Sequence, residues 1–202
     1  MTGIVPKNYD KSYFDRWYRS PAAVVTPDSR RARVRLAVAA AEFVLGRRIR
    51  SVLDVACGEA PWRADLVRMR PGISYIGIDS SDYVVRRYGT RRNIRLGSIG
   101  SLHRMKLRRK FDLIVCSDVL EYVPTAEVRR GLRAMRTLLR GLAYIEAFTN
   151  RANFVGDTEG WHYRSEPVYR KAFTDAGLYS CGLNCWVARS LFDQLGPFER
   201  CS

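Results

Sequence analysis

Three short segments of this sequence combine small residues with carboxylates at the ends of apolar runs. The first is 54–60, Asp-Val-Ala-Cys-Gly-Glu-Ala. The second ends at Asp79, twenty-five positions after Asp54, and the third begins with Ser117 and Asp118. A turn of small residues lets a ligand approach the backbone, and a carboxylate about twenty residues further on suits the two hydroxyls of a ribose. The segments therefore predict a ligand that contains a ribose.

Apolar runs and amphipathic segments alternate along the chain and must position these residues. We expect strands at 51–55, 73–78, 94–96, 111–116 and 142–148, with one or two closing strands within 179–188. We expect helices at 28–45, 62–69, 81–88, 125–140 and 165–176, the first capped by Asp28 or Ser29 and the fourth by Thr125. This alternation predicts an α/β fold with a parallel sheet covered on both faces. Ligands bind such sheets outside the carboxyl ends of the strands, where the three segments fall.

In their order and placement these residues resemble the class I S-adenosylmethionine-dependent methyltransferases, over roughly 51–148. The resemblance implies a Rossmann-like, doubly wound, mostly parallel sheet of seven strands, with S-adenosylmethionine as the cofactor. It implies that Asp79 holds the ribose hydroxyls, that Asp54 and the 56–58 backbone hold the methionine part, and that Ser98 lies near the adenine. The expected cofactor contacts are Tyr13, Asp54, Ala56, Cys57, Gly58, Asp79, Ser80, Ser98, Ile99, Ser117 and Asp118.

The first segment departs from this family at its glycines. The family has an acidic residue and then Gly-x-Gly-x-Gly, whereas this sequence has Ala56, Gly58 and Ala60. Alanine is a tolerable replacement only where φ is negative. A dinucleotide site fits less well, because its third glycine would fall at Pro61, and proline removes a backbone N–H that a pyrophosphate needs. A Rossmann-like domain without a cofactor is the remaining alternative.

Methyl transfer from a sulfonium is a direct in-line displacement, for which the protein aligns the acceptor and excludes water. An N or O acceptor can also need a base to take its proton. The candidates at the strand ends are Asp118, Glu121, Tyr122 and Glu146. His162 is a further candidate, in a segment (149–164) that is long for a connection and is interpreted as a substrate-covering loop. We expect Asp118, Glu121 and His162 to be the catalytic residues.

A chain of 202 residues fits one domain, and no repeat or linker divides it. We expect residues 1–29 to form a lid, 30–148 the cofactor-binding core, and 149–202 the substrate-side loop with a closing helix and strands. The lid is predicted because the first segment is too aromatic for a disordered tail. Its aromatic residues are Tyr9, Tyr13, Phe14, Trp17 and Tyr18.

The sequence is basic, with a net charge of +15 from 35 basic and 20 acidic residues. Residues 86–110 include ten Lys or Arg and no Asp or Glu. Arginines at 129, 133, 136 and 140 have the spacing that places them on one helix face. Because such surfaces bind phosphates, 86–110 and 129–140 make RNA an alternative substrate. A high-GC genome would explain the preference for arginine over lysine equally well.

A small metabolite is the favoured substrate, because the aromatic arm and the 149–164 loop are both placed to close over a compact ligand. A metabolite with a carboxylate or phosphate would use arginines such as Arg16, Arg19 or Arg164. A noncatalytic partner protein, which would bind no cofactor, is a third hypothesis. We expect a monomer or a homodimer.

Cysteine and histidine are scarce, with five of the former and two of the latter. This is too few for a zinc site, so we expect no metal and reduced thiols. No run approaches the eighteen or so apolar residues of a membrane helix, and the first residues lack the layout of a secretory signal. We therefore expect a cytoplasmic protein without membrane contact.

Overall fold

The computed structural model describes residues 7–19, 25–152 and 156–195. Parts of the predicted lid (1–6 and 20–24) and the end of the closing segment (196–202) lie outside these residues. The helices are α1 (Lys11–Tyr18), α2 (Pro27–Leu45), α3 (Pro61–Met69), α4 (Asp82–Arg92), α5 (Thr125–Leu138), α6 (Glu166–Asp175) and α7 (Arg189–Phe192). Two short 3₁₀ turns are η1 (Leu102–Arg104) and η2 (Leu120–Tyr122).

Seven strands form one sheet in the order β3-β2-β1-β4-β5-β7-β6. Their bounds are β1 (Ser51–Val55), β2 (Ser74–Asp79), β3 (Ile94–Leu96), β4 (Phe111–Cys116), β5 (Leu139–Ile145), β6 (Leu178–Ser180) and β7 (Cys185–Ala188). The neighbours from β3 to β5 pair in parallel, and β7 is antiparallel to both β5 and β6. The predicted doubly wound, mostly parallel, seven-stranded sheet is confirmed.

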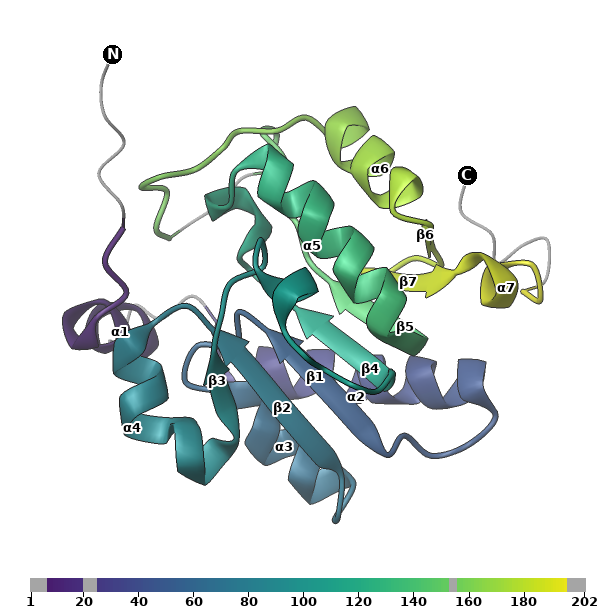
Figure 1. Cartoon of the computed structure of the whole chain (residues 1–202), viewed down its shortest axis with the longest axis horizontal. Coiled ribbons are helices and arrows are strands. Elements are labelled where there is room, and N and C mark those ends of the chain that lie inside the picture. Colours follow the sequence, from purple (N-terminus) through teal and green to yellow (C-terminus); the bar gives the residue numbers. More distant parts are fainter. Residues whose placement is uncertain (1–6, 20–24, 153–155, 196–202) are drawn as a thin grey trace.

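Apolar side chains from the helices cover both faces of the sheet. One buried cluster joins Val34 of α2, Leu66 of α3 and Val84 of α4 to one face, and another joins Leu132 of α5 and Phe173 of α6 to the other. Figure 1 shows α5 and α6 on one side of the sheet and α2 and α3 on the other. The strand order reverses between β1 and β4, so a crevice is expected at their carboxyl ends.

The N-terminal ends of two helices differ from the prediction. The cap of α2 is Thr26, whose side chain accepts from the Ser29 N–H at 3.2 Å, so neither Asp28 nor Ser29 caps this helix. Helix α5 begins at Thr125 itself, after Pro124, and has no side-chain cap. Two other predictions are confirmed. Ser81 caps the N-terminus of α4, and Gly46, with φ of 63°, ends α2.

The arginine face predicted for 129–140 is shorter than expected. Helix α5 ends at Leu138, and Leu139 already has the extended backbone of β5, where it pairs with Phe111. Arg140 therefore lies on a strand, and its guanidinium donates to Asp112 at 3.0 Å. The prediction of one helix to residue 140 and a strand at 142–148 was wrong, because helix and strand follow each other without a loop.

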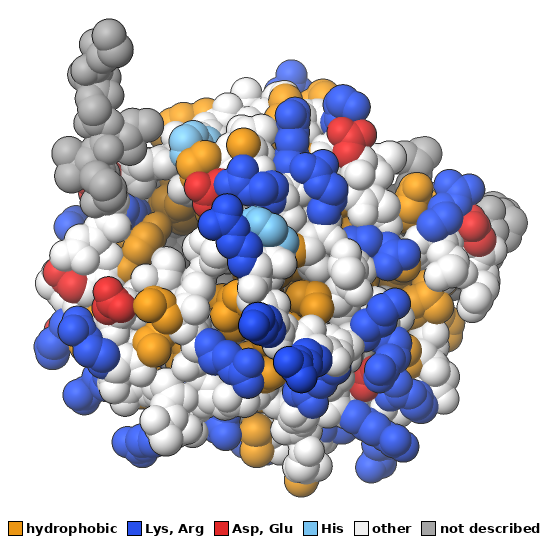
Figure 2. All heavy atoms as spheres, viewed as in Figure 1, with side chains coloured by type: hydrophobic (Ala, Val, Ile, Leu, Met, Phe, Trp, Pro, Cys, Tyr) orange, Lys and Arg blue, Asp and Glu red, His pale blue; other side chains and the backbone are white. Residues whose placement is uncertain are grey.

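Lysine and arginine side chains are scattered over the face that carries α4, β3 and α5, with uncharged atoms between them (Figure 2). In the part of the chain that is described, no helix is both long and apolar enough to cross a membrane.

Candidate functional site

A cavity of about 400 Å³ lies at the carboxyl ends of β1 to β4. Helix α1 and residues 156–157 of the predicted loop also line it. Eleven of the predicted site residues line this one cavity: Tyr13, Asp54, Ala56, Cys57, Gly58, Asp79, Ser80, Ser98, Ile99, Ser117 and Asp118. The sequence-predicted cofactor residues are thus brought together, although their individual roles stay predictions.

The loop between β1 and α3 has a left-handed backbone at all three positions where the family has glycine. The φ angles are 56° at Ala56, 53° at Gly58 and 57° at Ala60. A non-glycine residue in this region is held there at a cost of roughly 1–2 kcal/mol. Ala56 and Ala60 therefore adopt the left-handed backbone under strain, and φ is positive at both positions where alanine replaces a glycine of the family pattern.

Gly58 also lies directly against helix α1. A Cβ atom added to it would lie 2.6 Å from the Tyr18 hydroxyl oxygen of α1, closer than atoms of this kind approach. Its backbone N–H donates to Asp79 Oδ2 at 2.6 Å. Glycine is therefore required at this position by the closeness of α1, since alanine adopts the same φ region at positions 56 and 60.

Asp79 connects the first loop to the start of α4. Its carboxylate accepts from the N–H groups of Gly58 (2.6 Å) and Ser81 (2.8 Å), and the residue is 7% exposed. Burial raises the pKa of this carboxyl, and the backbone donors lower it. The carboxylate is thus held in a fixed position at the edge of the cavity, as a ribose-binding residue must be.

Asp54 is more deeply buried at the end of β1. Its Oδ2 accepts from the Tyr75 hydroxyl at 2.7 Å. Burial raises its pKa to about 7, with Asp79 contributing in the same direction. A cation bound in the cavity would therefore favour the ionised form of this group.

The segment after β3 forms a tight turn in which Ser98 and Ser101 bond to each other. The Ser98 N–H donates to Ser101 Oγ at 2.8 Å, and the Ser101 N–H donates to Ser98 Oγ at 3.1 Å. Ile99 is buried next to them. The Ser98 hydroxyl oxygen thus already accepts one hydrogen bond within the protein and keeps capacity for another.

An ion-pair cluster occupies the ends of β4 and β5. The Arg33 guanidinium of α2 donates to Asp118 at 3.2 Å and to Glu146 at 3.0 Å. Glu146 also accepts from the Ser117 and Tyr144 hydroxyls. Burial and the nearby Glu146 raise the pKa of Asp118, while Arg33 lowers it. Sequence reasoning missed Arg33, because nothing distinguishes it from its neighbouring arginines until α2 is placed against β4.

The two carboxylates of this cluster differ in how fully they are bonded. Both oxygens of Glu146 accept hydrogen bonds. Asp118 Oδ1 is buried and receives no hydrogen bond from any described residue. Asp118 also has a left-handed backbone, with φ of 55°. Among the described residues, this buried oxygen is therefore the carboxylate atom of the cluster that lacks a hydrogen-bond partner.

The other two predicted catalytic residues do not line the cavity. Glu121 is 1% exposed, and neither of its carboxylate oxygens has a hydrogen-bond partner among the described residues. Burial raises its pKa to about 7. His162 pairs with it through the backbone, donating its N–H to the Glu121 carbonyl at 2.7 Å. The 156–164 loop is thus attached to η2, and Asp118 alone of the three catalytic candidates borders the cavity.

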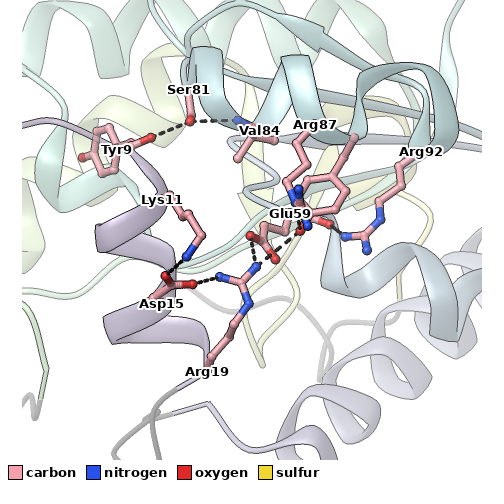
Figure 3. Close-up of polar contacts among 10 residues, drawn as sticks. Tyr9, Lys11, Asp15, Arg19, Glu59, Ser81, Val84, Arg87 and Arg92 are labelled. Atoms are coloured by element: carbon pink, nitrogen blue, oxygen red, sulfur yellow. Dashed lines mark hydrogen bonds and ion pairs between the residues drawn. The ribbon is translucent and has the colours of Figure 1, made fainter.

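Ion pairs and hydrogen bonds attach residues 9–19 to the loop after β1 and to the start of α4 (Figure 3). Arg19, at the end of α1, pairs with Asp15 and with Glu59 of the first loop, each at 2.5 Å. The Tyr9 carbonyl accepts from the Ser81 hydroxyl, also at 2.5 Å. Residues of this segment line the cavity, and its attachment to Glu59 was not foreseen; its role as a lid stays a prediction.

The sequence and the structure were compared with known proteins. Residues 52–141 match the family model of a methyltransferase domain. A comparison with curated proteins gave no match.

Many solved structures share the fold. A S-adenosylmethionine-dependent methyltransferase from Archaeoglobus fulgidus is 16% identical, with a TM-score of 0.62 over 83% of this chain and 73% of that one. A sugar N-methyltransferase from a Streptoalloteichus species is 18% identical, with a TM-score of 0.62 over 94% of both chains. The magnesium protoporphyrin IX methyltransferase of Synechocystis, solved with S-adenosylhomocysteine, is 20% identical, with a TM-score of 0.59 over 84% and 86%.

The family match and the fold agree with the resemblance seen in the sequence. Residues 52–141 therefore form a methyltransferase domain, and the sheet that contains it has the Rossmann-like, mostly parallel strand order. The protein is an enzyme of a class whose methyl donor is S-adenosylmethionine.

Proposed function

We propose that this protein transfers a methyl group from S-adenosylmethionine to an N or O atom of a small molecule held in the cavity. The observation that carries the proposal is the covered cavity of about 400 Å³, lined at once by the strand ends, α1 and residues 156–157. Sites of this size and concavity are typical of small ligands. A covered cavity also excludes water from the sulfonium and from the acceptor.

The residues present fit S-adenosylmethionine. Asp79 is fixed at the strand end to accept the ribose hydroxyls, and Gly58, whose N–H donates to Asp79, lines the same cavity. Asp54 borders the same cavity and would hold the methionine part. When bound, the cofactor supplies an electrophilic methyl group on a positively charged sulfur. The carboxylates of the cavity favour that charge by Coulombic attraction.

Asp118 is the proposed proton acceptor. The residue borders the cavity, and burial and the nearby Glu146 raise its pKa, which makes it a better base than an ordinary surface aspartate. Arg33 and Ser117 donate to Oδ2 of Asp118 and so fix the orientation of its carboxylate. Glu146, which is fully bonded, is proposed to fix Arg33 rather than to react.

The charges of the cavity favour a neutral or cationic acceptor over an acidic one. Both arginines that line the cavity are paired, Arg30 with Asp65 at 3.0 Å and Arg33 with Asp118 and Glu146. The carboxylates that line it are Asp54, Asp79, Asp118, Glu127 and Asp157. A substrate carboxylate or phosphate would meet repulsion there without a free arginine to bind it.

RNA is less well supported as a substrate, because three of the arginines in the proposed RNA-binding segments donate hydrogen bonds within the protein. Arg92 donates to the Glu59 carbonyl, Arg109 to the Ser74 hydroxyl, and Arg140 to Asp112. A strong, steeply salt-dependent binding of RNA would favour that alternative. The monomeric or homodimeric state and a cytoplasmic location stay predictions.

Calorimetry with S-adenosylhomocysteine tests the cofactor assignment. We expect binding by the wild type and a loss of about thirtyfold or more in Asp79→Ala, because the ribose loses a charge-assisted hydrogen-bond partner. The matched control is Asp82→Ala, which removes an exposed carboxylate three residues along the chain and should bind like the wild type. No heat with the wild type, or equal affinities of wild type and Asp79→Ala, would show the assignment to be wrong.

A further inference from the structure

The ammonium of Lys7 lies among three tyrosine rings at the edge of the cavity. Its Nζ is 5.9 Å from the ring centre of Tyr9, 5.3 Å from that of Tyr13 and 4.3 Å from that of Tyr122. The same Nζ forms an ion pair with Asp157 and donates to the Glu159 carbonyl. The three tyrosines and Asp157 are called the tyrosine cage below. All four of them line the cavity, whereas Lys7 does not.

The tyrosine cage has the chemistry of a site for an organic cation. Ring faces carry negative potential, and several rings around one ammonium form the arrangement that binds such groups in proteins. The carboxylate adds a full opposite charge in a partly desolvated place, since the side chains of Lys7 and Asp157 are only 14% and 11% exposed. Lys7 shows that an ammonium is accommodated there, next to two acceptors and three rings.

The elements that build the cage are those that cover the cavity. Tyr13 belongs to α1, Tyr9 precedes it, Tyr122 ends η2, and Asp157 lies in the loop after β5. The Tyr122 hydroxyl also donates to the Asp157 carbonyl, so two walls of the cage stay together without Lys7. A long, unbranched lysine side chain can leave such a place by rotation about its own bonds.

The other charged residues that line the cavity also favour a cationic ligand. The arginines of the cavity are neutralised by carboxylates, and Asp54 and Asp79 face it without a basic side chain bonded to them. This is notable in a protein with a net charge of +15, whose exterior would repel a cation. Something other than the overall charge must therefore account for the acidic and aromatic lining.

We propose that the tyrosine cage binds an ammonium group of the acceptor substrate, and that Lys7 occupies this place while the substrate is absent. The proposal rests on the proposed function and names its substrate class: small molecules that carry an organic ammonium. The caged nitrogen anchors the substrate and is not the atom that is methylated, because a protonated nitrogen has no lone pair to attack the methyl group. The acceptor atom is a second N or O of the same molecule.

The probe for this proposal is n-butylammonium, which reproduces the lysine side chain, with 1-butanol as its uncharged counterpart. Both are titrated into protein saturated with S-adenosylhomocysteine, and the Tyr122 ring resonances are followed by NMR. In Lys7→Ala the vacated cage should bind n-butylammonium at least about fivefold more tightly than 1-butanol. In the wild type the same shifts should appear at about tenfold higher concentration, because the probe must displace Lys7.

Two further variants, made in the Lys7→Ala background, test whether the rings are responsible. Tyr122→Leu should weaken n-butylammonium binding by roughly three- to thirtyfold, since it removes the nearest ring. Tyr122→Phe keeps the ring and should change the affinity by less than about threefold. Unfolding curves of all variants exclude a general loss of structure.

Three results would overturn the proposal. They are equal binding of the two probes by Lys7→Ala, equal affinities of Tyr122→Leu and Tyr122→Phe, and absence of any shift in the wild type at a hundredfold excess over the concentration that saturates Lys7→Ala. The last result would make Lys7 a permanent part of the lid. Failure of the wild type to bind S-adenosylhomocysteine would instead contradict the proposed function, so the two failures are distinguished.

Discussion

The interior and the exterior of this protein carry opposite charges. Among the residues that the structure describes, the buried charged side chains are six acidic ones and Arg164. Over the whole sequence, by contrast, 35 basic residues outnumber 20 acidic ones. The buried acidic residues are Asp54, Asp65, Asp79, Asp112, Glu121 and Glu146. Most of them border or support the cavity, while lysines and arginines are spread over the face of the molecule shown in Figure 2.

This difference separates the long-range effect of the net charge from the short-range effect of the buried carboxylates. The net charge sets how the molecule meets its surroundings, by long-range forces that salt screens. The interior carboxylates act over a few ångströms, where screening is weak, and therefore set the ionisation and the ligand preference of the site. The same substitution should accordingly have a large effect inside and a small one outside.

The largest expected effect is the pH dependence caused by Glu121. Its pKa is raised from 4.5 to about 7 in the folded protein, so folding favours its protonated form. The stabilising effect is full below the unfolded pKa and is lost as the pH rises through 7. Between pH 5 and pH 8 this residue should lower the free energy of unfolding by about 2 to 3 kcal/mol. Asp54, whose pKa is also raised to about 7, should lower the free energy of unfolding over the same pH range.

Urea unfolding at the two pH values measures this fall, and Glu121→Gln should make it smaller by about 2 kcal/mol or more. The outer counterpart is Glu166→Gln, which changes an exposed glutamate on α6 paired with Arg170. That variant should keep the wild-type difference between the two pH values. An unchanged difference in Glu121→Gln would mean that the buried carboxyl is not the source.

The second prediction concerns Arg33, the cation between two inner carboxylates. Arg33→Ala should lower the free energy of unfolding by about 1–2 kcal/mol, because Asp118 and Glu146 lose a shared donor. Arg35→Ala removes an exposed arginine two positions away on the same helix and should stay within about 0.5 kcal/mol of the wild type. Thermal and urea unfolding compare the two variants.

Arg33→Ala should also raise the pKa of Asp118 further, since the nearby positive charge that lowers it is gone. The pH profile of any methyl transfer that uses Asp118 as a base would then move to higher pH. A profile that stays in place while Arg33→Ala remains folded would contradict the proposed role of Asp118.

These pairs also indicate which features the sequence could reveal. The strand ends at Asp54, Asp79 and Asp118 were predictable, because apolar runs end there and the sheet topology gathers those ends. The Arg33 contacts were not, since Arg33 and Glu146 are 113 positions apart and α2 carries several similar arginines. His162 was expected in the site from its residue type, but its place depends on how the loop pairs with η2. The arginine face was overextended because side-chain periodicity does not show where a helix becomes a strand.

The third prediction uses the left-handed backbone of the inner loop. Ala56→Gly should stabilise the protein by about 0.5–1 kcal/mol, because relief of the left-handed alanine exceeds the entropy that glycine costs. Ala64 is the outer counterpart, an exposed residue within α3. Ala64→Gly should destabilise by about 1 kcal/mol, as glycine does in a helix interior. Unfolding curves that move in the same direction for both variants would disprove the strain at Ala56.

The smallest effect is expected from the exterior alone. Arg129 and Arg133 are exposed on α5, one turn apart, and no ion pair is found for either among the described residues. Changing both to Gln should alter the free energy of unfolding by less than about 0.5 kcal/mol and leave the affinity for S-adenosylhomocysteine as it is. If the double variant instead lost activity toward the substrate while keeping its fold and its cofactor, the basic exterior would have to bind that substrate. An anionic macromolecule would then replace the small cationic acceptor, because only a ligand that extends beyond the cavity reaches α5.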